Sequence, residues 1–134
     1  MSAEDNIKTV QAMYEAFGRG DGPAILEALV DDIDWATDTA SLAAPWYGVR
    51  RTKEEVGRFF EAFGSTMEVE EFTPLTVAAN DDAVLTVVRC RAKVRANGAP
   101  VDMNLHHYFR FEGPRVAYYR GTEDSAQVES ALRA

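Results

Sequence analysis

The residue best suited to proton transfer in this sequence is His107, one of two histidines. An imidazole titrates near neutral pH, and burial or a neighbouring carboxylate can tune its pKa for general acid–base work. Within Pro100–Phe111 it alternates with apolar residues, so we expect it to stand in an apolar interior. The alternative is a core histidine that is satisfied by a backbone carbonyl.

Two carboxylates are candidate partners in that chemistry. Asp124 follows the last alternating segment, where it would hold a histidine in the right tautomer or act as the base itself. It is equally suited to the N-cap of a short tail helix. Asp38 lies among small residues in an irregular stretch, where it is either a base at the mouth of a pocket or a solvated side chain.

A further group of residues is suited to holding a flat apolar ligand, because binding pockets are mostly aromatic with a few polar anchors. Tyr14 would donate its hydroxyl to a substrate oxygen, although its spacing from Val10 and Phe17 also fits a core position. The other members either line a cavity or pack in the core. They are Trp35, Trp46, Phe59, Phe63, Met103 and Tyr119.

We expect neither a metal nor an organic cofactor. Cys90 is the single cysteine, so neither an intrachain disulfide nor a thiolate metal cage can form. His106 and His107 are adjacent, which places them on opposite faces of a strand and argues against a two-histidine metal site.

Composition narrows the choice of partners. The 134 residues include 14 Lys and Arg against 22 Asp and Glu, and the formal net charge of −8 repels nucleic acid and anionic lipid alike. The apolar runs fall short of the roughly 20 residues that cross a bilayer. Met1–Asp5 lacks the basic start and apolar run of a secretory signal, so we expect a cytoplasmic protein. At this length we expect a single domain over residues 1–134.

Three helices are predicted ahead of the main strands. Apolar residues recur at helical spacing after Ser2 and stop at a run of glycines that begins with Gly18. Asp21 is suited to cap a second, short helix. Thr52 and Glu55 have the spacing of a capping box, and an aromatic stripe follows them. We expect the three helices to end near residues 18, 30 and 64.

Beyond Ser65 the periodicity becomes alternating, which is typical of an antiparallel meander. Even-numbered residues of 83–94 and odd-numbered residues of 101–111 are expected to face the core. Residues 40–48 are expected to form a loop over the mouth of a pocket, and the last segment, with Val128 and Leu132, a short tail helix. The predicted strands span 33–37, 67–79, 83–96, 100–111 and 115–122, with turns at 80–82, 97–98 and 112–114.

These elements predict an α+β fold. The N-terminal helices pack on the concave face of a strongly curved, mixed but mostly antiparallel sheet, and the resulting cone encloses a pocket.

The order of these features resembles the NTF2-like superfamily over nearly the whole chain. The features are Asp21 after a Gly, Asp31-Asp32 ahead of a strand, and His107–Phe111 before a Glu-Gly turn. Residues 10–21, 28–32 and 108–111 look like the branch that contains the SnoaL-like polyketide cyclases and the ketosteroid isomerases. The resemblance implies the cone-shaped fold and a homodimer through the face of the sheet.

The resemblance also implies residue roles. Ketosteroid isomerases use a Tyr and a protonated Asp as oxyanion hole and another Asp as base, and these positions fall on Met13, His107 and Thr37. A methionine cannot donate the required hydrogen bond, so these residues argue against steroid isomerisation but not against an acid–base pocket. SnoaL-like cyclases use a His and an Asp to move protons, and a carboxylate near the end of the last strand, where Asp124 lies, is common in that branch.

We therefore expect a cofactor-independent acid–base enzyme of the isomerase, cyclase or hydratase type that acts on a small hydrophobic carbonyl compound in an apolar pocket. Two alternatives stay open, namely capture of an apolar ligand without catalysis and a dimeric interaction module with a vestigial cavity. The outer face of the sheet carries Tyr108 and His106 beside a ladder of Arg and Lys, and we expect a homodimer to form there.

Overall fold

The change of periodicity in the sequence coincides with a change from helix to sheet in the computed structural model, which describes residues 1–134. The helices are α1 (Ala3–Gly18), α2 (Gly22–Glu27), α3 (Lys53–Thr66) and α4 (Ser125–Arg133). The strands are β1 (Leu29–Thr37), β2 (Met67–Ala79), β3 (Ala83–Val94), β4 (Pro100–Glu112) and β5 (Arg115–Thr122).

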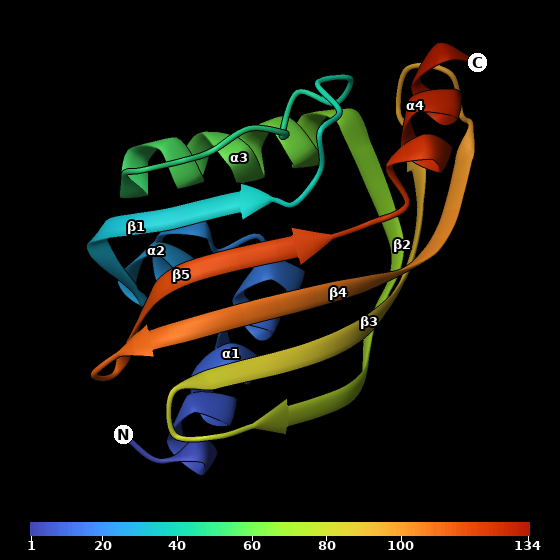
Figure 1. Ribbon diagram of the computed structural model, residues 1–134. Coiled ribbons are helices and arrows are strands. Elements are labelled where there is room, and N and C mark those ends of the chain that lie inside the picture. Colours follow the sequence, from blue (N-terminus) through green and yellow to red (C-terminus); the bar gives the residue numbers. More distant parts are fainter.

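The five strands form one curved sheet in the order β1-β5-β4-β3-β2 (Figure 1). The first strand, β1, runs parallel to β5, and all other neighbours are antiparallel. Strand β2 is an edge strand with register shifts at Val69/Glu71 and Pro74/Thr76, and such bulges bend a strand and increase its twist. The mixed, mostly antiparallel and strongly curved sheet confirms the predicted fold class.

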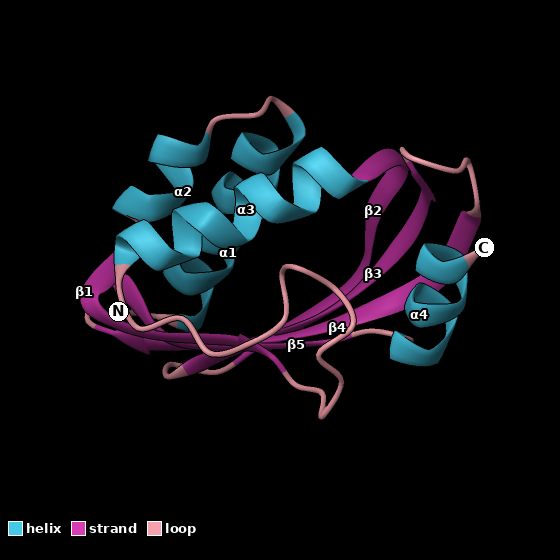
Figure 2. Cartoon of the chain, turned by 90° about the horizontal axis from the view of Figure 1, so that it is seen from above, coloured by secondary structure: helices cyan, strands magenta, loops and turns pink.

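Three helices cover one face of this sheet, and α4 lies over its far end (Figures 1 and 2). Side-chain caps fix where the helices begin. The Ser2 and Asp5 side chains form a capping box at α1, and Asp21 caps α2. Thr52 caps α3, and Asp124 caps α4. Each cap satisfies a backbone N–H that the helix leaves unpaired.

The inner face of the sheet is apolar as the alternation predicts. Every even-numbered residue of 84–94 and every odd-numbered residue of 101–109 is buried, whereas Phe111, beyond a register shift, is only half-buried. The buried residues fall into two clusters, one around α1, α2, β1 and β5, the other around Trp46, α4 and the opposite ends of β3 and β4. Tyr14 and Phe59 are packed against both clusters, so they mark the junction between them.

Three predicted boundaries were wrong by a few residues, one of them the end of β3, which lies at Val94 and not at Ala96. The second helix ends at Glu27 and not near Val30, and the first strand begins at Leu29 and not at Ile33. The backbone N–H of Val116 donates to Ala28, and Leu29 pairs with Val116. Tertiary pairing with β5 therefore outweighs the helical spacing of this short segment.

No helix reaches the length and apolar character that a membrane crossing requires. Nowhere do three His, Cys, Asp or Glu side chains gather as metal ligands would.

Candidate acid–base site

A hydrogen-bonded set of three side chains lies at the junction of the two core clusters. The Tyr14 hydroxyl on α1 is 2.8 Å from Nδ1 of His107 on β4 and 2.6 Å from Oγ1 of Thr86 on β3. Thr86 and His107 are direct cross-strand partners, and the helix lays Tyr14 over both of them. The neighbours of His107 on β4, Leu105 and Phe109, belong to opposite clusters.

The His107 imidazole is neutral in this environment. Its side chain is 9% exposed, and burial lowers its pKa from 6.5 to about 3, with the nearby His106 as a smaller cause. Burial disfavours the charged form because the interior cannot replace the solvation that water gives an imidazolium.

The second imidazole nitrogen is free. The one fully buried side-chain nitrogen or oxygen without a hydrogen-bond partner is Nε1 of Trp35. Nε2 of His107 has no partner either, so it must reach accessible space. A neutral imidazole carries one proton. If Nδ1 accepts from Tyr14, Nε2–H is a donor to a ligand, and if Nδ1 donates to Tyr14, Nε2 is an acceptor.

A second hydroxyl lies beside the imidazole. His107 pairs across the strands with Gly121, and a Cβ at Gly121 would lie 2.2 Å from the Tyr119 hydroxyl and 3.3 Å from Cδ2 of His107. The missing side chain is what lets Tyr119 place its hydroxyl there. This hydroxyl also has no hydrogen-bond partner, so like Nε2 it reaches accessible space. Burial raises the pKa of Tyr119 well above its usual value, which keeps it a donor.

A carboxyl group that sequence reasoning missed lies in the same interior. Glu123 accepts hydrogen bonds from the Tyr47 hydroxyl at 2.9 Å and from Nε1 of Trp46 at 3.4 Å. Burial raises its pKa, and the two hydrogen bonds only partly offset this. Its charge also adds to the burial that raises the pKa of Cys90 on β3 to about 11. The carboxyl group therefore lies within electrostatic reach of the inner face of the sheet.

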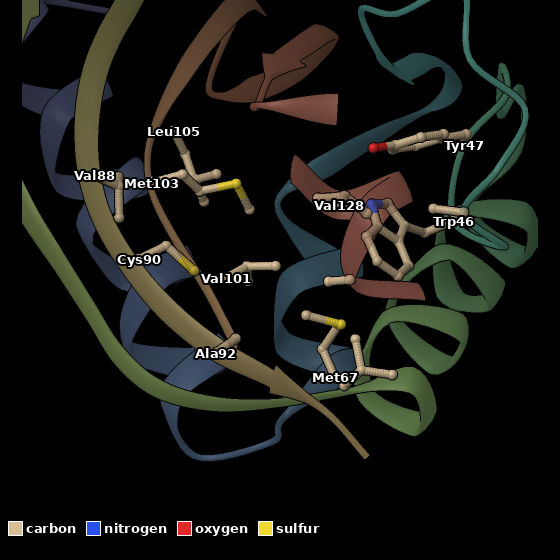
Figure 3. Packing of buried hydrophobic residues seen from close by; sticks show 13 residues of the cluster. Trp46, Tyr47, Met67, Val88, Cys90, Ala92, Val101, Met103, Leu105 and Val128 are labelled. Atoms are coloured by element: carbon tan, nitrogen blue, oxygen red, sulfur yellow. The ribbon is translucent and has the colours of Figure 1, made fainter. Parts of the chain in front are cut away.

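The surroundings of Glu123 are apolar. Figure 3 shows Met103 and Leu105 on one side, and Trp46 and Val128 facing them from the other. In this cluster Trp46 is 1% exposed and Tyr47 is 7% exposed.

The two predicted carboxylates lie elsewhere. Asp124 is exposed, and its oxygens accept from the backbone and side-chain nitrogens of Gln127 at the start of α4. Asp38 is also exposed, and it borders a hollow on the outer face of the sheet together with His106 and Arg120. Neither carboxylate is hydrogen-bonded to His107, although His107 also lines the hollow that Asp38 borders.

The predicted lining residues gather around the site as aromatic pairs. Trp35 stacks on Tyr119 with ring centroids 3.9 Å apart, and Phe59 meets Trp35 edge to face at 5.6 Å. Trp46 meets Phe63 edge to face at 5.1 Å. These edge-to-face and stacked contacts restrict the orientation of the rings that surround the polar groups.

The alternation of residues along the strands could have identified several of the site residues. Tyr119, Gly121 and Glu123 follow one another at period two, which places their side chains on one side of the chain, whereas Asp124 falls on the other. Thr86 alternates with buried valines in the same way. The role of Tyr47 depends on a loop whose course the sequence does not indicate.

The arrangement combines hydrogen-bond donors with a half-buried carboxyl group whose charge reaches Tyr119. Tyr14, His107 and Tyr119 can stabilise negative charge on an oxygen, and Glu123 can exchange a proton. Such a set fits proton transfer on an apolar molecule that carries one oxygen.

Comparison with known proteins places the chain in a family. Residues 10–119 match the SnoaL-like domain. No curated protein is significantly similar in sequence. An NTF2-like protein of unknown function from Burkholderia pseudomallei is 25% identical, with full coverage of both chains and a TM-score of 0.89.

Two further solved structures share the fold. A protein described as a candidate isomerase from Rhodopseudomonas palustris is 20% identical, with full coverage of both chains and a TM-score of 0.80. A candidate polyketide cyclase from Xanthomonas campestris is 16% identical over 98% of this chain and 99% of its own, also with a TM-score of 0.80. The chain thus has the NTF2-like fold and belongs to the SnoaL-like domain family.

Proposed function

We propose that this protein is a cofactor-independent acid–base enzyme, of the isomerase, cyclase or hydratase type, that moves a proton on a small hydrophobic carbonyl compound. The observation that carries the proposal is the Tyr14–His107 hydrogen bond, with Nε2 of His107 left free inside an aromatic interior. Two solved structures of the same fold, described as a candidate isomerase and a candidate cyclase, are consistent with this class.

In the proposed reaction the substrate carbonyl oxygen accepts hydrogen bonds from Nε2–H of His107 and from the Tyr119 hydroxyl. The Tyr14 hydroxyl donates to Nδ1 and thereby holds the tautomer that carries the proton on Nε2. Thr86 in turn donates to the Tyr14 oxygen. Neutral donors suit this task, because a donor aimed at the developing charge stabilises the transition state more than the ground state.

The Glu123 carboxylate is the proposed base. It takes a proton from the carbon next to the carbonyl, the C–H electron pair moves toward the oxygen to form an enolate, and the carboxylic acid then returns the proton to another atom of the substrate. A raised pKa makes the carboxylate a stronger base than an exposed glutamate, which favours removal of a weakly acidic proton.

Exchange of substrate protons in D₂O tests this proposal directly, because formation of an enolate replaces C–H by C–D. Flat apolar ketones such as 2-tetralone and 1-indanone serve as probes, followed by ¹H NMR. We expect exchange above the buffer rate, reduced about 10²–10⁴-fold in Glu123→Gln and in His107→Gln. Asp124→Asn is the matched control and should keep its rate. Equal exchange rates in Glu123→Gln and the unmodified protein would show that Glu123 is not the base.

A binding role without catalysis is the second candidate. Both oxygens of Glu123 already accept hydrogen bonds, so this carboxyl group would serve to hold Trp46 and Tyr47 in place around an apolar ligand. In that case the ketones would shift the NMR signals of the protein while their own protons exchanged at the buffer rate.

A further inference from the structure

A groove on the helical side of the molecule lies outside the carboxyl site described above. It runs between α1, α2, α3 and β2, and its volume is about 1130 Å³. Half-buried aromatic rings form its floor, and Tyr14 is the one residue that it shares with the hydrogen-bonded set. The floor consists of Tyr14, Phe17, Phe60, Phe63 and Phe72.

The aromatic rings of the floor gather around Phe17. Its ring centroid is 4.8 Å from that of Phe72 and 6.1 Å from those of Phe60 and Phe63. The rings tilt against one another, and all four remain partly exposed to the groove. Several ring surfaces are thus presented to one bound molecule.

The rim of the groove is acidic. Glu15, Glu61 and Glu68 are exposed along it, and none of them has an ion-pair partner or a side-chain hydrogen bond. The one basic residue that lines the groove is Arg95, whose Nε donates to the carbonyl of Gly64. A cation entering the groove therefore meets three uncompensated carboxylates, whereas an anion is repelled by them.

We infer that this groove binds small apolar compounds that carry a protonated amine. Aromatic ring faces and carboxylates both attract an organic cation, and here they lie on the floor and rim of one groove. The inference concerns binding alone and does not depend on the reaction proposed above.

Three compounds with one skeleton test the charge preference, namely 4-phenylbutylamine, 4-phenylbutan-1-ol and 4-phenylbutanoate. Binding is followed by ¹H–¹⁵N NMR, with the backbone amides of Gly18, Gly57 and Gly64 as reporters because these glycines line the groove. At about 20 mM salt the amine should bind about tenfold more tightly than the carboxylate, with the alcohol between them. In about 0.5 M salt the difference should shrink, because screening weakens exposed charges.

Two sets of variants assign the effect to the groove. The double change Glu61→Gln with Glu68→Gln should lower the affinity for the amine until it is close to the affinity for the alcohol. The control pair Glu4→Gln with Glu112→Gln changes the net charge by the same amount away from the groove and should leave the two affinities different. A Cβ at Gly64 meets no atom within 4 Å, so Gly64→Leu places an apolar side chain in the groove and should abolish the shifts of Gly18 and Gly57.

Four results would overturn the inference. They are equal affinity for amine and carboxylate, equal effects of the rim and control pairs, shifts centred on Gly121 in place of the groove glycines, and absence of binding by any probe up to about 10 mM.

Discussion

His107 is the residue that the sequence favours for proton transfer, yet it is buried in the structure. Its pKa is lowered to about 3 by burial, so it stays neutral where most enzymes work. A neutral imidazole that is held by Tyr14 is better suited to donate a hydrogen bond than to accept and release a proton. The group whose proton affinity burial increases is Glu123, because desolvation raises the pKa of its carboxyl group.

The lowered pKa of His107 predicts a loss of stability in mild acid. In the unfolded chain the imidazole has its usual pKa of about 6.5 and is protonated below that pH. In the folded chain its pKa is about 3, so it stays neutral until the pH falls to that value. The unfolded state therefore binds more protons in this window, and the free energy of unfolding falls by up to about 1.4 kcal/mol per pH unit as the pH decreases.

Urea unfolding between pH 4.5 and 7.5 measures this slope. His107→Gln should reduce the slope of unfolding free energy against pH. The raised pKa of Glu123 contributes a slope of opposite sign in both proteins, so the slopes of the variant and the unmodified protein are compared with each other. Equal slopes in the variant and the unmodified protein would mean that the folded protein protonates His107 as readily as the unfolded chain.

The contact between Tyr119 and Gly121 gives a second prediction at this scale. A methyl group at Gly121 would lie 2.2 Å from the Tyr119 hydroxyl oxygen and 2.9 Å from Cζ, and the ring cannot move freely because it stacks on Trp35. Gly121→Ala should therefore cost about 1–3 kcal/mol.

Thermal unfolding measures this cost, and two further variants serve as controls. Adding Tyr119→Phe to Gly121→Ala removes the closer contact and should recover part of the loss. Gly64 lies in α3, and a Cβ added there would meet no atom within 4 Å. Gly64→Ala should therefore raise the free energy of unfolding by up to about 1 kcal/mol. A Gly121→Ala protein as stable as the unmodified one would contradict the geometry of the site.

At the residue scale the sequence indicates which polar and aromatic side chains stand on apolar faces, but not which carboxyl group the structure buries. Tyr14, Tyr119 and His107 could be selected because aromatic and imidazole groups stand out on apolar faces. Asp124 stands out in the sequence because a carboxylate near the end of the last strand is common in the branch that the chain resembles, whereas no such pattern marks Glu123. In the structure Asp124 caps α4, and the side of the chain that faces the interior belongs to Glu123.

At the scale of elements, one loop closes the site. Residues 38–52 connect β1 to α3, and they place Trp46 and Tyr47 against Glu123. Ser41 adds a hydrogen bond to Glu129 on α4. The loop is thus held by side chains that come after the sheet in the sequence, a long-range arrangement that local periodicity does not indicate.

Tyr47→Phe tests how far this contact holds the loop. The change removes a hydrogen bond to a buried carboxyl group, so we expect a loss of about 1–3 kcal/mol. Because the Tyr47 hydroxyl lowers the pKa of Glu123, its removal should also raise that pKa further. Ser130→Ala, at an exposed position on α4, is the control for loss of a hydroxyl.

Unfolding experiments give the stability, and the ¹³C shift of the Glu123 carboxyl group across pH gives its pKa. An unchanged titration in Tyr47→Phe would show that the hydroxyl does not reach the carboxylate in solution.

The elements themselves were largely predictable because their signals are local. Strand pairs with clear alternation, such as β3 and β4, have the predicted faces, and the caps at Ser2 and Thr52 begin the predicted helices. The exception, the boundary between α2 and β1, depends on pairing with a strand about 85 residues later.

At the scale of the whole molecule, we propose that two copies associate through the outer face of the sheet. Leu85 is 54% exposed there, beside a hollow of about 450 Å³ that Tyr108 and Tyr118 border. Arg110 and Arg120 lie over the Tyr118 ring at 4.2 and 4.3 Å, so aromatic and charged groups alternate on this face. An exposed apolar patch of this kind, with a polar rim, is typical of an interface.

Light scattering at micromolar concentration should give twice the mass of the chain. Leu85→Glu should convert the dimer to a monomer, because it places charge in the centre of the interface. Leu42→Glu, at a loop position that is 88% exposed, should leave the dimer intact. A monomer at every concentration would rule out this association.

The central claim is that one interior site presents Nε2 of His107 and the Tyr119 hydroxyl to a substrate oxygen. A crystal structure with 2-naphthol, a flat apolar enolate analogue, tests it most directly. The account predicts the naphthol oxygen within about 3 Å of both groups, with its rings against Trp35 or Trp46. A structure in which naphthol binds only outside this interior, or in which backbone groups occupy Nε2, would contradict the account.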